Sequence, residues 1–246
     1  MKKLFFLPVA LFALIISTHA QVRFGVKAGL NLSNVSGSSD VDDFYEDEYL
    51  GKGFNPKIIP SFVVGAQVEY DFSASLGISS GLQITGKGFK LDESFLEDDE
   101  RITYDEKTTA YYLQIPVQLT YHKGGFFGAV GPYVGFGIAG KYRYEYDDEF
   151  FREEDDGKIE FTNDVDVDDE LDALTAKLNP IDFGAGLELG YEFTNLRLSA
   201  SYSLGLTNIY PKDLVDLIDQ ELNLDNFKAS HRVISIGATW MFGERE

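Results

Sequence analysis

The feature that most constrains this chain is a two-residue alternation of apolar and polar side chains. In residues 22–33 every even position is apolar and every odd position is charged, polar or glycine. Successive side chains of a strand point to opposite faces, so this pattern predicts a β-strand with one apolar face. Seven more segments alternate in the same way and complete a set of eight predicted strands: 62–72, 76–85, 111–121, 130–144, 181–193, 196–206 and 234–242.

Two architectures fit eight such strands. A soluble barrel or sandwich turns its apolar faces inward, whereas a membrane barrel turns them to lipid and fills its lumen with polar groups. The polar faces favour the membrane barrel, because they combine many glycines with charges of both signs, which suits a narrow interior better than a solvated surface. The charged residues expected in the lumen are Arg23, Lys27, Glu69, Lys141, Arg143, Asp182, Glu188, Glu192 and Arg197.

The connections between the predicted strands differ sharply in length. Asp71–Ala74, His122–Gly125 and Phe193–Asn195 are tight turns, and four long connections alternate with them. Short periplasmic turns and long extracellular loops are typical of an up-and-down outer-membrane barrel. The long connections, 35–57, 91–107, 145–178 and 208–228, hold 34 of the 41 acidic residues. This charge argues against a nucleic-acid partner and indicates acidic loops at the cell surface.

Aromatic side chains are expected where the barrel wall meets the lipid headgroups. One girdle is predicted beside the short turns and chain ends: Phe24, Phe72, Tyr121, Phe126, Phe193, Trp240 and Phe242. A second girdle near the long loops would contain Phe62, Tyr111, Tyr142 and Tyr144. Pro116 and Pro132 lie inside two neighbouring strands, where they cannot donate ladder hydrogen bonds, and predict a bulge or a local break.

The N-terminus reads as an export signal. Lys2 and Lys3 precede the apolar run Leu4–Ile16, and small residues lie near Ala20. This order predicts a cleaved signal peptide at residues 1–20 and a mature barrel domain at 21–246, with an uncleaved anchor as the alternative. Leu4–Ile16 is shorter than the about 20 residues of a membrane-spanning helix.

Few residues suggest catalysis or metal binding. The chain has no cysteine, which removes thiolate chemistry. His231 with a loop aspartate is the candidate for an enzyme acting on lipid or peptide at the barrel rim. Asp164, Asp166 and Asp168 are candidates for weak Ca²⁺ or Mg²⁺ binding, although they lack the glycine of an EF-hand loop. We expect no catalytic residue and no cofactor beyond such an ion.

Short motifs along the strands resemble the PorT-type outer-membrane β-barrel family of Bacteroidetes. The segments that carry the resemblance are Phe24–Ser33, Tyr112–Pro116, Gly131–Tyr133, Asp182–Gly186 and Leu204–Ile209. The resemblance implies an eight-stranded barrel of the OmpX or OmpA kind in a Gram-negative outer membrane. It also implies that both prolines are family features. Most of the family has no assigned activity, and the branch that gives it its name is linked to type IX secretion.

The sequence therefore predicts an all-β, eight-stranded, monomeric barrel without enzymatic activity. We expect a structural or interaction role at the cell surface, with outer-membrane lipid and cell-surface or secretion-system proteins as partners. A rim enzyme and a narrow solute or ion channel through the wall near Pro116 and Pro132 remain alternatives. Two loop segments, Asp169–Leu178 and Asp213–Leu222, place leucines on one helical face and predict short helices over the barrel mouth.

Overall fold

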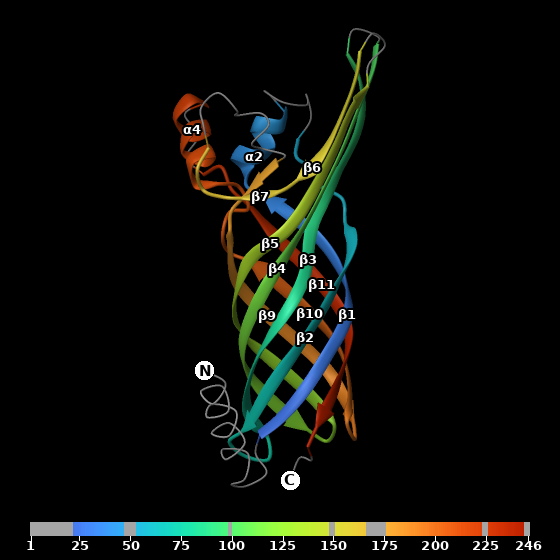
Figure 1. Ribbon diagram of the computed structural model, residues 1–246, viewed down its shortest axis with the longest axis vertical. Helices are drawn as coiled ribbons and strands as arrows, with labels where there is room; N and C mark the ends of the chain where they lie inside the picture. The colour runs from blue at the N-terminus through green and yellow to red at the C-terminus, as the bar shows by residue number, and fades with distance from the viewer. Residues whose placement is uncertain are drawn as a thin grey trace, which may run out of the picture.

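Figure 1 shows a computed structural model of the chain as a β-barrel with additional structure above one rim. The structure describes residues 22–46, 53–97, 100–147, 151–165, 176–222 and 226–243. The predicted signal peptide lies outside these residues. None of the helices in the described ranges combines the length and apolarity that a membrane-crossing helix needs.

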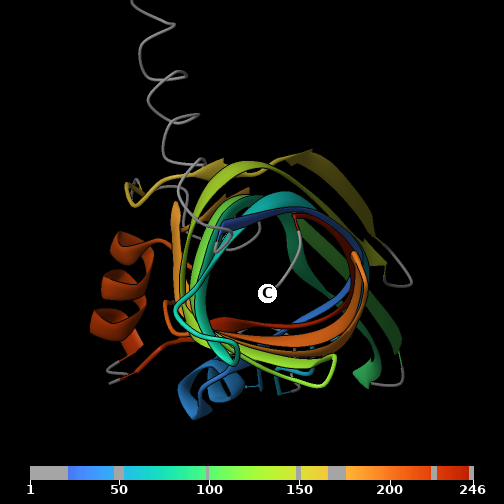
Figure 2. The same ribbon diagram turned by 90° about the horizontal axis from the view of Figure 1, so that it is seen from below.

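Eight antiparallel strands close the barrel, in the ring order β1-β2-β3-β4-β5-β9-β10-β11 and back to β1 (Figure 2). The number and order of these strands confirm the predicted fold class. Their bounds are β1 Val22–Gly37, β2 Ile59–Asp71, β3 Leu76–Glu97, β4 Glu100–Lys123, β5 Phe126–Asp147, β9 Ile181–Phe193, β10 Leu196–Gly205 and β11 Ala229–Phe242.

The alternation sorts the side chains as the membrane interpretation requires. Leu30 is 69% exposed on the outer wall, while its neighbour Asn31 is fully buried inside. Ile236 on the paired strand β11 is 65% exposed, and Thr239 on the opposite face of that strand is fully buried. The apolar residues therefore form the outside of the barrel, and polar residues fill the lumen.

The short turns lie together at one rim. Gly124 and Gly125 join β4 to β5 with φ angles of 58° and 87°, which favour glycine because it has no Cβ. Thr194, between β9 and β10, also has a positive φ of 53°. In an outer-membrane barrel this rim faces the periplasm, and the opposite rim faces the cell exterior.

Three strands continue beyond the extracellular rim. The sequence predicts a loop over Leu91–Lys107, but β3 and β4 remain paired up to Glu97 and Glu100. β6 (Arg152–Lys158) pairs with the upper part of β5, so that β3, β4, β5 and β6 form a four-stranded sheet above the barrel. We call this sheet the extension; it is the tall projection in Figure 1.

One extra residue separates the barrel part of β5 from the extension. Tyr111 of β4 pairs with Ala139, whereas Tyr112 pairs with Gly137, so Ile138 has no partner across the ladder. A bulge of this kind reverses which face each later residue occupies. Below Ile138 the odd residues of β5 point into the lumen, and above it the even residues point to the inner side.

The two prolines break the ladder without shifting the register. The pairing of β3 with β4 skips Pro116 and resumes on both sides, and that of β4 with β5 skips Pro132. The hydroxyl of Ser80 donates to the Pro116 carbonyl at 2.8 Å, which gives that oxygen a partner. Of the two alternatives predicted for the prolines, the structure has the local break, and the bulge lies at Ile138 instead.

Two helices and a small parallel sheet lie at the extracellular end, and Figure 2 shows both helices outside the outline of the barrel ring. α4 (Lys212–Leu222) confirms the helix predicted over Asp213–Leu222, and α2 (Ser39–Phe44) is an additional helix. β7 (Glu160–Phe161) pairs with β8 (Lys177–Leu178). β8 includes the last two residues of the helix predicted over Asp169–Leu178, so that helix does not reach Leu178; its other residues, except Ala176, lie outside the described ranges.

Candidate functional site: a charged lumen under an aromatic cap

Four charged side chains cross the lumen at its periplasmic end. Arg23 on β1 donates to Glu69 on β2 at 2.5 Å and to Glu192 on β9. Arg197 on β10 donates to the same two carboxylates, at 3.0 Å and 2.7 Å. Glu69 is fully buried, and the two arginines are at most 2% exposed. Because each charge meets an opposite charge, these side chains satisfy one another while closing the lumen.

A second ion pair lies halfway along the lumen. Lys27 Nζ is 2.8 Å from Glu188 Oε2, and the hydroxyl of Ser199 donates to the other Glu188 oxygen at 2.6 Å. Two small cavities of about 40 and 20 Å³ flank this pair, and Lys27 and Glu188 line both of them. Spaces of this size hold one water molecule or a few.

A third ion pair lies below the extracellular mouth. Lys87 Nζ is 2.5 Å from Asp182 Oδ2, and its ammonium lies 4.3 Å from the centre of the Tyr133 ring. Both charged residues are at most 3% exposed. The sequence predicts Asp182 in the lumen but misses Lys87, because the predicted strand ends at Thr85. Lys87 keeps the odd parity of the lumen-facing residues of this strand, but the glycines on both sides of it, Gly86 and Gly88, interrupt the alternation.

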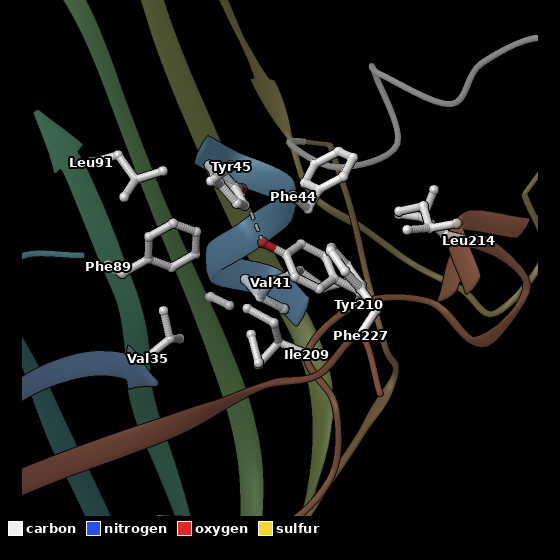
Figure 3. Close-up of a cluster of buried hydrophobic side chains, with 14 of the residues drawn as sticks. Val35, Val41, Phe44, Tyr45, Phe89, Leu91, Ile209, Tyr210, Leu214 and Phe227 are labelled. Carbon is white, nitrogen blue, oxygen red and sulfur yellow. Dashed lines mark hydrogen bonds between the residues drawn. The ribbon is translucent and has the colours of Figure 1, made fainter. Parts of the chain in front are cut away.

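An aromatic cap lies at the extracellular end of the barrel (Figure 3). We use this name for the buried cluster that joins α2, the extension and the segment after β10. The Tyr45 and Tyr210 hydroxyls are 3.1 Å apart, and the Phe44 and Phe227 rings meet edge to face. Members of the cap that Figure 3 labels are Val35, Val41, Phe44, Tyr45, Phe89, Leu91, Ile209, Tyr210, Leu214 and Phe227.

Glu106 lies on the inner side of the extension beside the cap and is 2% exposed. It accepts hydrogen bonds from the hydroxyls of Tyr104 at 2.9 Å and Thr108 at 3.3 Å. Burial disfavours the charged carboxylate and raises the pKa of Glu106 to about 7. The sequence gives no indication of this, because Glu106 falls in a segment predicted to be a solvated loop.

Seven of the nine residues expected in the lumen lie there and form the ion pairs above: Arg23, Lys27, Glu69, Asp182, Glu188, Glu192 and Arg197. Lys141 and Arg143 do not. Both are exposed on the outer side of the extension, because the bulge at Ile138 reverses the faces of β5 before they are reached. Their inward neighbours are tyrosines.

The periplasmic aromatic residues lie on the outer wall. Six are between 50% and 67% exposed, namely Phe72, Tyr121, Phe126, Phe193, Trp240 and Phe242, and Phe24 is half-buried. At the other rim Phe62 is 42% exposed and contacts Tyr111. Tyr142 and Tyr144 do not belong to that second girdle. The same bulge turns them inward, where they pack against the cap.

The structure places only one of the three acidic residues proposed as metal ligands. Asp164 is exposed, and Asp166 and Asp168 lie outside the described residues. Within the described ranges, Glu69, Asp71 and His122 bring three ligand atoms within 4.8 Å of one another. Arg23 and Arg197 already donate to both oxygens of Glu69, so a divalent ion there would compete with two guanidinium groups.

His231 is buried in this arrangement. It is 2% exposed, and its Nε2 lies 3.4 Å from the Tyr112 hydroxyl. The Phe161 ring of β7 packs against Tyr112 from above. A substrate at the barrel rim would therefore have to displace part of the cap before it could reach His231.

A closed ring of antiparallel strands with an apolar outer wall and a charged lumen defines an integral outer-membrane β-barrel protein. Residues 17–210 match the family described as "Outer membrane protein beta-barrel domain", and the chain belongs to that family. The outer membrane is accordingly its location. No protein with a curated description matches the sequence.

Several solved outer-membrane barrels are similar in fold. Ail, the attachment invasion locus protein of Yersinia pestis, has 14% identity and a TM-score of 0.38, covering 90% of this chain and 99% of its own. Neisserial surface protein A has 11% identity and a TM-score of 0.36, covering 89% and 97%. The outer membrane protease OmpT of Escherichia coli has 10% identity and a TM-score of 0.30, covering 90% and 97%. These similarities concern the fold alone.

Proposed function

We propose that this protein is a closed, non-enzymatic barrel that presents a folded surface to partners outside the cell. The observation that carries the proposal is the extension, in which β3, β4 and β5 remain regular strands well beyond the barrel rim. Ordering so many residues in water costs conformational entropy. Anchoring the protein in the membrane does not require these residues, so anchoring alone does not explain why they are ordered. A surface-protein interaction, envelope integrity or support of secretion would each use such a projection.

The side chains that fill the lumen support a closed barrel. Three levels of buried ion pairs cross the lumen, and the cavities between them are small. A narrow barrel filled by side chains does not pass solutes in the way a porin does. The prolines do not open the wall, because strand pairing resumes on both sides of each break.

The cap argues against the rim enzyme centred on His231. The imidazole contacts the Tyr112 hydroxyl and ring, and both residues are at most 2% exposed. A general base needs access to the proton it removes. We therefore expect His231→Ala to retain every surface phenotype of the wild type, and loss of a hydrolytic activity would revive the enzyme alternative.

The register allows the extension to be shortened without a shift in strand pairing, and Leu91 of the cap is removed with it. Phe89 pairs with Thr108, and Tyr142 pairs with Gly157, so a two-residue turn at each pair would close both hairpins without a shift. Surface cross-linking in intact cells should capture partners with the wild type and lose them with this shortened variant. Heat-modifiable mobility in gels serves as the folding control. An identical cross-linked set from a folded shortened barrel would refute the role of the extension.

Two finer assignments belong to the same proposal. We infer that residues 1–20 are removed on export, which N-terminal sequencing of the protein from outer membranes would test. The motifs Tyr112–Pro116 and Asp182–Gly186 support membership of the PorT-type branch of barrels. We propose no link to type IX secretion beyond that membership.

A further inference from the structure

The outer side of the extension carries a row of like charges. Lys90 of β3 is directly opposite Lys107 of β4, and Lys107 is directly opposite Arg143 of β5. In the next row towards the membrane, Lys141 is opposite Lys158 of β6. Residues directly opposite in an antiparallel pair share a face. We call these five cations the basic belt.

The chain as a whole has 41 acidic and 21 basic residues, so a cluster of cations is unusual in it. Like charges directly opposite one another destabilise a sheet. Lysines often protect exposed sheet edges, but Lys107, Lys141 and Arg143 lie on β4 and β5, which are interior strands of the extension. Protection of an edge therefore does not account for the belt.

A row of four carboxylates, Asp92, Asp105, Glu145 and Glu154, borders the belt on the side away from the membrane, and Lys141 and Lys158 lie one row further from it than the other belt residues. Lys90 pairs with Asp105 at 2.6 Å and with Asp92 at 3.2 Å, and Arg143 is 3.8 Å from Glu145. Asp156 faces Arg143 across the ladder. Among the described residues, Lys107, Lys141 and Lys158 form no ion pair, and all three are exposed.

The belt lies just above the lipid-facing wall. Ile138, 50% exposed, is three residues below Lys141, and Tyr111 of the outer wall is four residues below Lys107. A rise of about 3.3 Å per residue on a strand tilted by roughly 40° places Lys141 and Lys107 about 7–10 Å above Ile138 and Tyr111. The headgroup layer extends roughly 5–7 Å beyond the hydrocarbon on each side, within reach of a flexible lysine side chain.

We propose that the basic belt binds the phosphate groups of outer-leaflet lipid headgroups. Ammonium and guanidinium groups are the usual partners of phosphate in proteins, and each surface cation contributes about a fivefold gain in affinity for anionic lipid. The bound phosphates would also relieve the repulsion between the opposed cations. Lipid of the outer leaflet is then a specific ligand of the extension.

The test uses the full-length folded protein in detergent. It is titrated with diphosphoryl lipid A, and bound lipid is counted by native mass spectrometry. The belt variant combines Lys107→Gln, Lys141→Gln and Lys158→Gln. The matched control removes the same charge elsewhere through Lys123→Gln, Lys212→Gln and Lys228→Gln. A third variant changes the three belt lysines to arginine and keeps their charge.

We expect the belt variant to lose affinity on the order of a hundredfold at low salt, because three surface cations are removed. The control and the arginine variant should stay close to the wild type. Dephosphorylated lipid A should bind poorly, and inorganic phosphate should not displace the lipid. Equal binding by wild type and belt variant, an equal loss in the control, or displacement by inorganic phosphate would each overturn the proposal. All variants are checked for heat-modifiable mobility.

Discussion

Arg197 donates two hydrogen bonds, 3.0 and 3.2 Å long, to the two carboxylate oxygens of Glu69 across the barrel lumen. The two residues are 128 positions apart in the sequence, on β10 and β2. Arg23 donates to the same carboxylate, so Glu69 balances charge from two fully enclosed guanidinium groups. This geometry makes Glu69 the residue on which the periplasmic end of the lumen depends most.

Glu69→Gln should therefore destabilise the barrel strongly. Removing one member of a buried ion pair leaves an uncompensated charge, which costs about 3–5 kcal/mol. Urea unfolding in lipid vesicles, followed by tryptophan fluorescence of Trp240, would measure this loss. Glu153→Gln on the exposed strand β6 is the matched control and should change the free energy of unfolding by less than about 0.5 kcal/mol. A Glu69→Gln barrel as stable as the control would show that the network contributes little.

The lumen should not conduct in the wild type. Planar bilayer recordings are expected to show no large steady current, because buried ion pairs cross the lumen and the cavities beside Lys27 and Glu188 are small. The double variant Lys27→Ala with Glu188→Ala removes two side chains that line both cavities and should join them. Small or transient currents in that variant alone would agree with this view, whereas a stable wild-type pore would contradict it.

Arginine on the outer wall should be costly only within the membrane. Ile236 is 65% exposed in the middle of β11, and Ile236→Arg should destabilise the barrel by about 2–4 kcal/mol. Phe72→Arg near the periplasmic rim places the same charge close to the headgroups, where the cost is about 0–1 kcal/mol. Refolding yields and urea titrations in vesicles would compare them. Equal costs would be inconsistent with a lipid-facing wall.

The cap should loosen as the pH rises. Burial raises the pKa of Glu106 from 4.5 to about 7, so the folded cap retains a proton that the unfolded segment has already lost. Stability is therefore greatest below pH 4.5 and falls by about 3 kcal/mol as the pH rises to about 7. Hydrogen exchange of α2 across this range would report the change.

Glu106→Gln keeps one acceptor oxygen, for the hydroxyl of Tyr104 or of Thr108, and cannot ionise. In this variant the α2 amides should have the same protection factors, relative to the intrinsic exchange rate at each pH, at low and neutral pH. Glu153→Gln removes an exposed carboxyl and should leave the wild-type pH dependence in place. If the glutamine variant retained the full pH dependence, another group would have to be responsible.

The alternation was sufficient to predict the barrel because lipid and lumen make opposite demands on neighbouring residues. Leu30 and Asn31 illustrate this, with one 69% exposed and the other fully buried. The ion pairs were predictable only as a set, since strand order and register decide that Arg197 meets Glu69. Lys87 was missed where the predicted strand ended too early.

Above the membrane, the alternation of apolar and polar residues no longer predicts the strands or their faces. Water on the outer side of the extension accepts charged residues, so Leu91–Lys107 reads as a loop although it contains two paired strands. The bulge at Ile138 has no sequence signal of its own. Parity counted from the barrel therefore assigns Tyr142, Tyr144, Lys141 and Arg143 to the wrong faces.

Ile138 also affects how this protein can evolve. Because the facing of every later residue in β5 depends on this one unpaired position, losing a single codon there would turn Tyr142 and Tyr144 to water and Lys141 and Arg143 toward the aromatic cap. One small deletion would thus exchange the inner and outer surfaces of this strand's extracellular half while leaving the part within the bilayer unchanged.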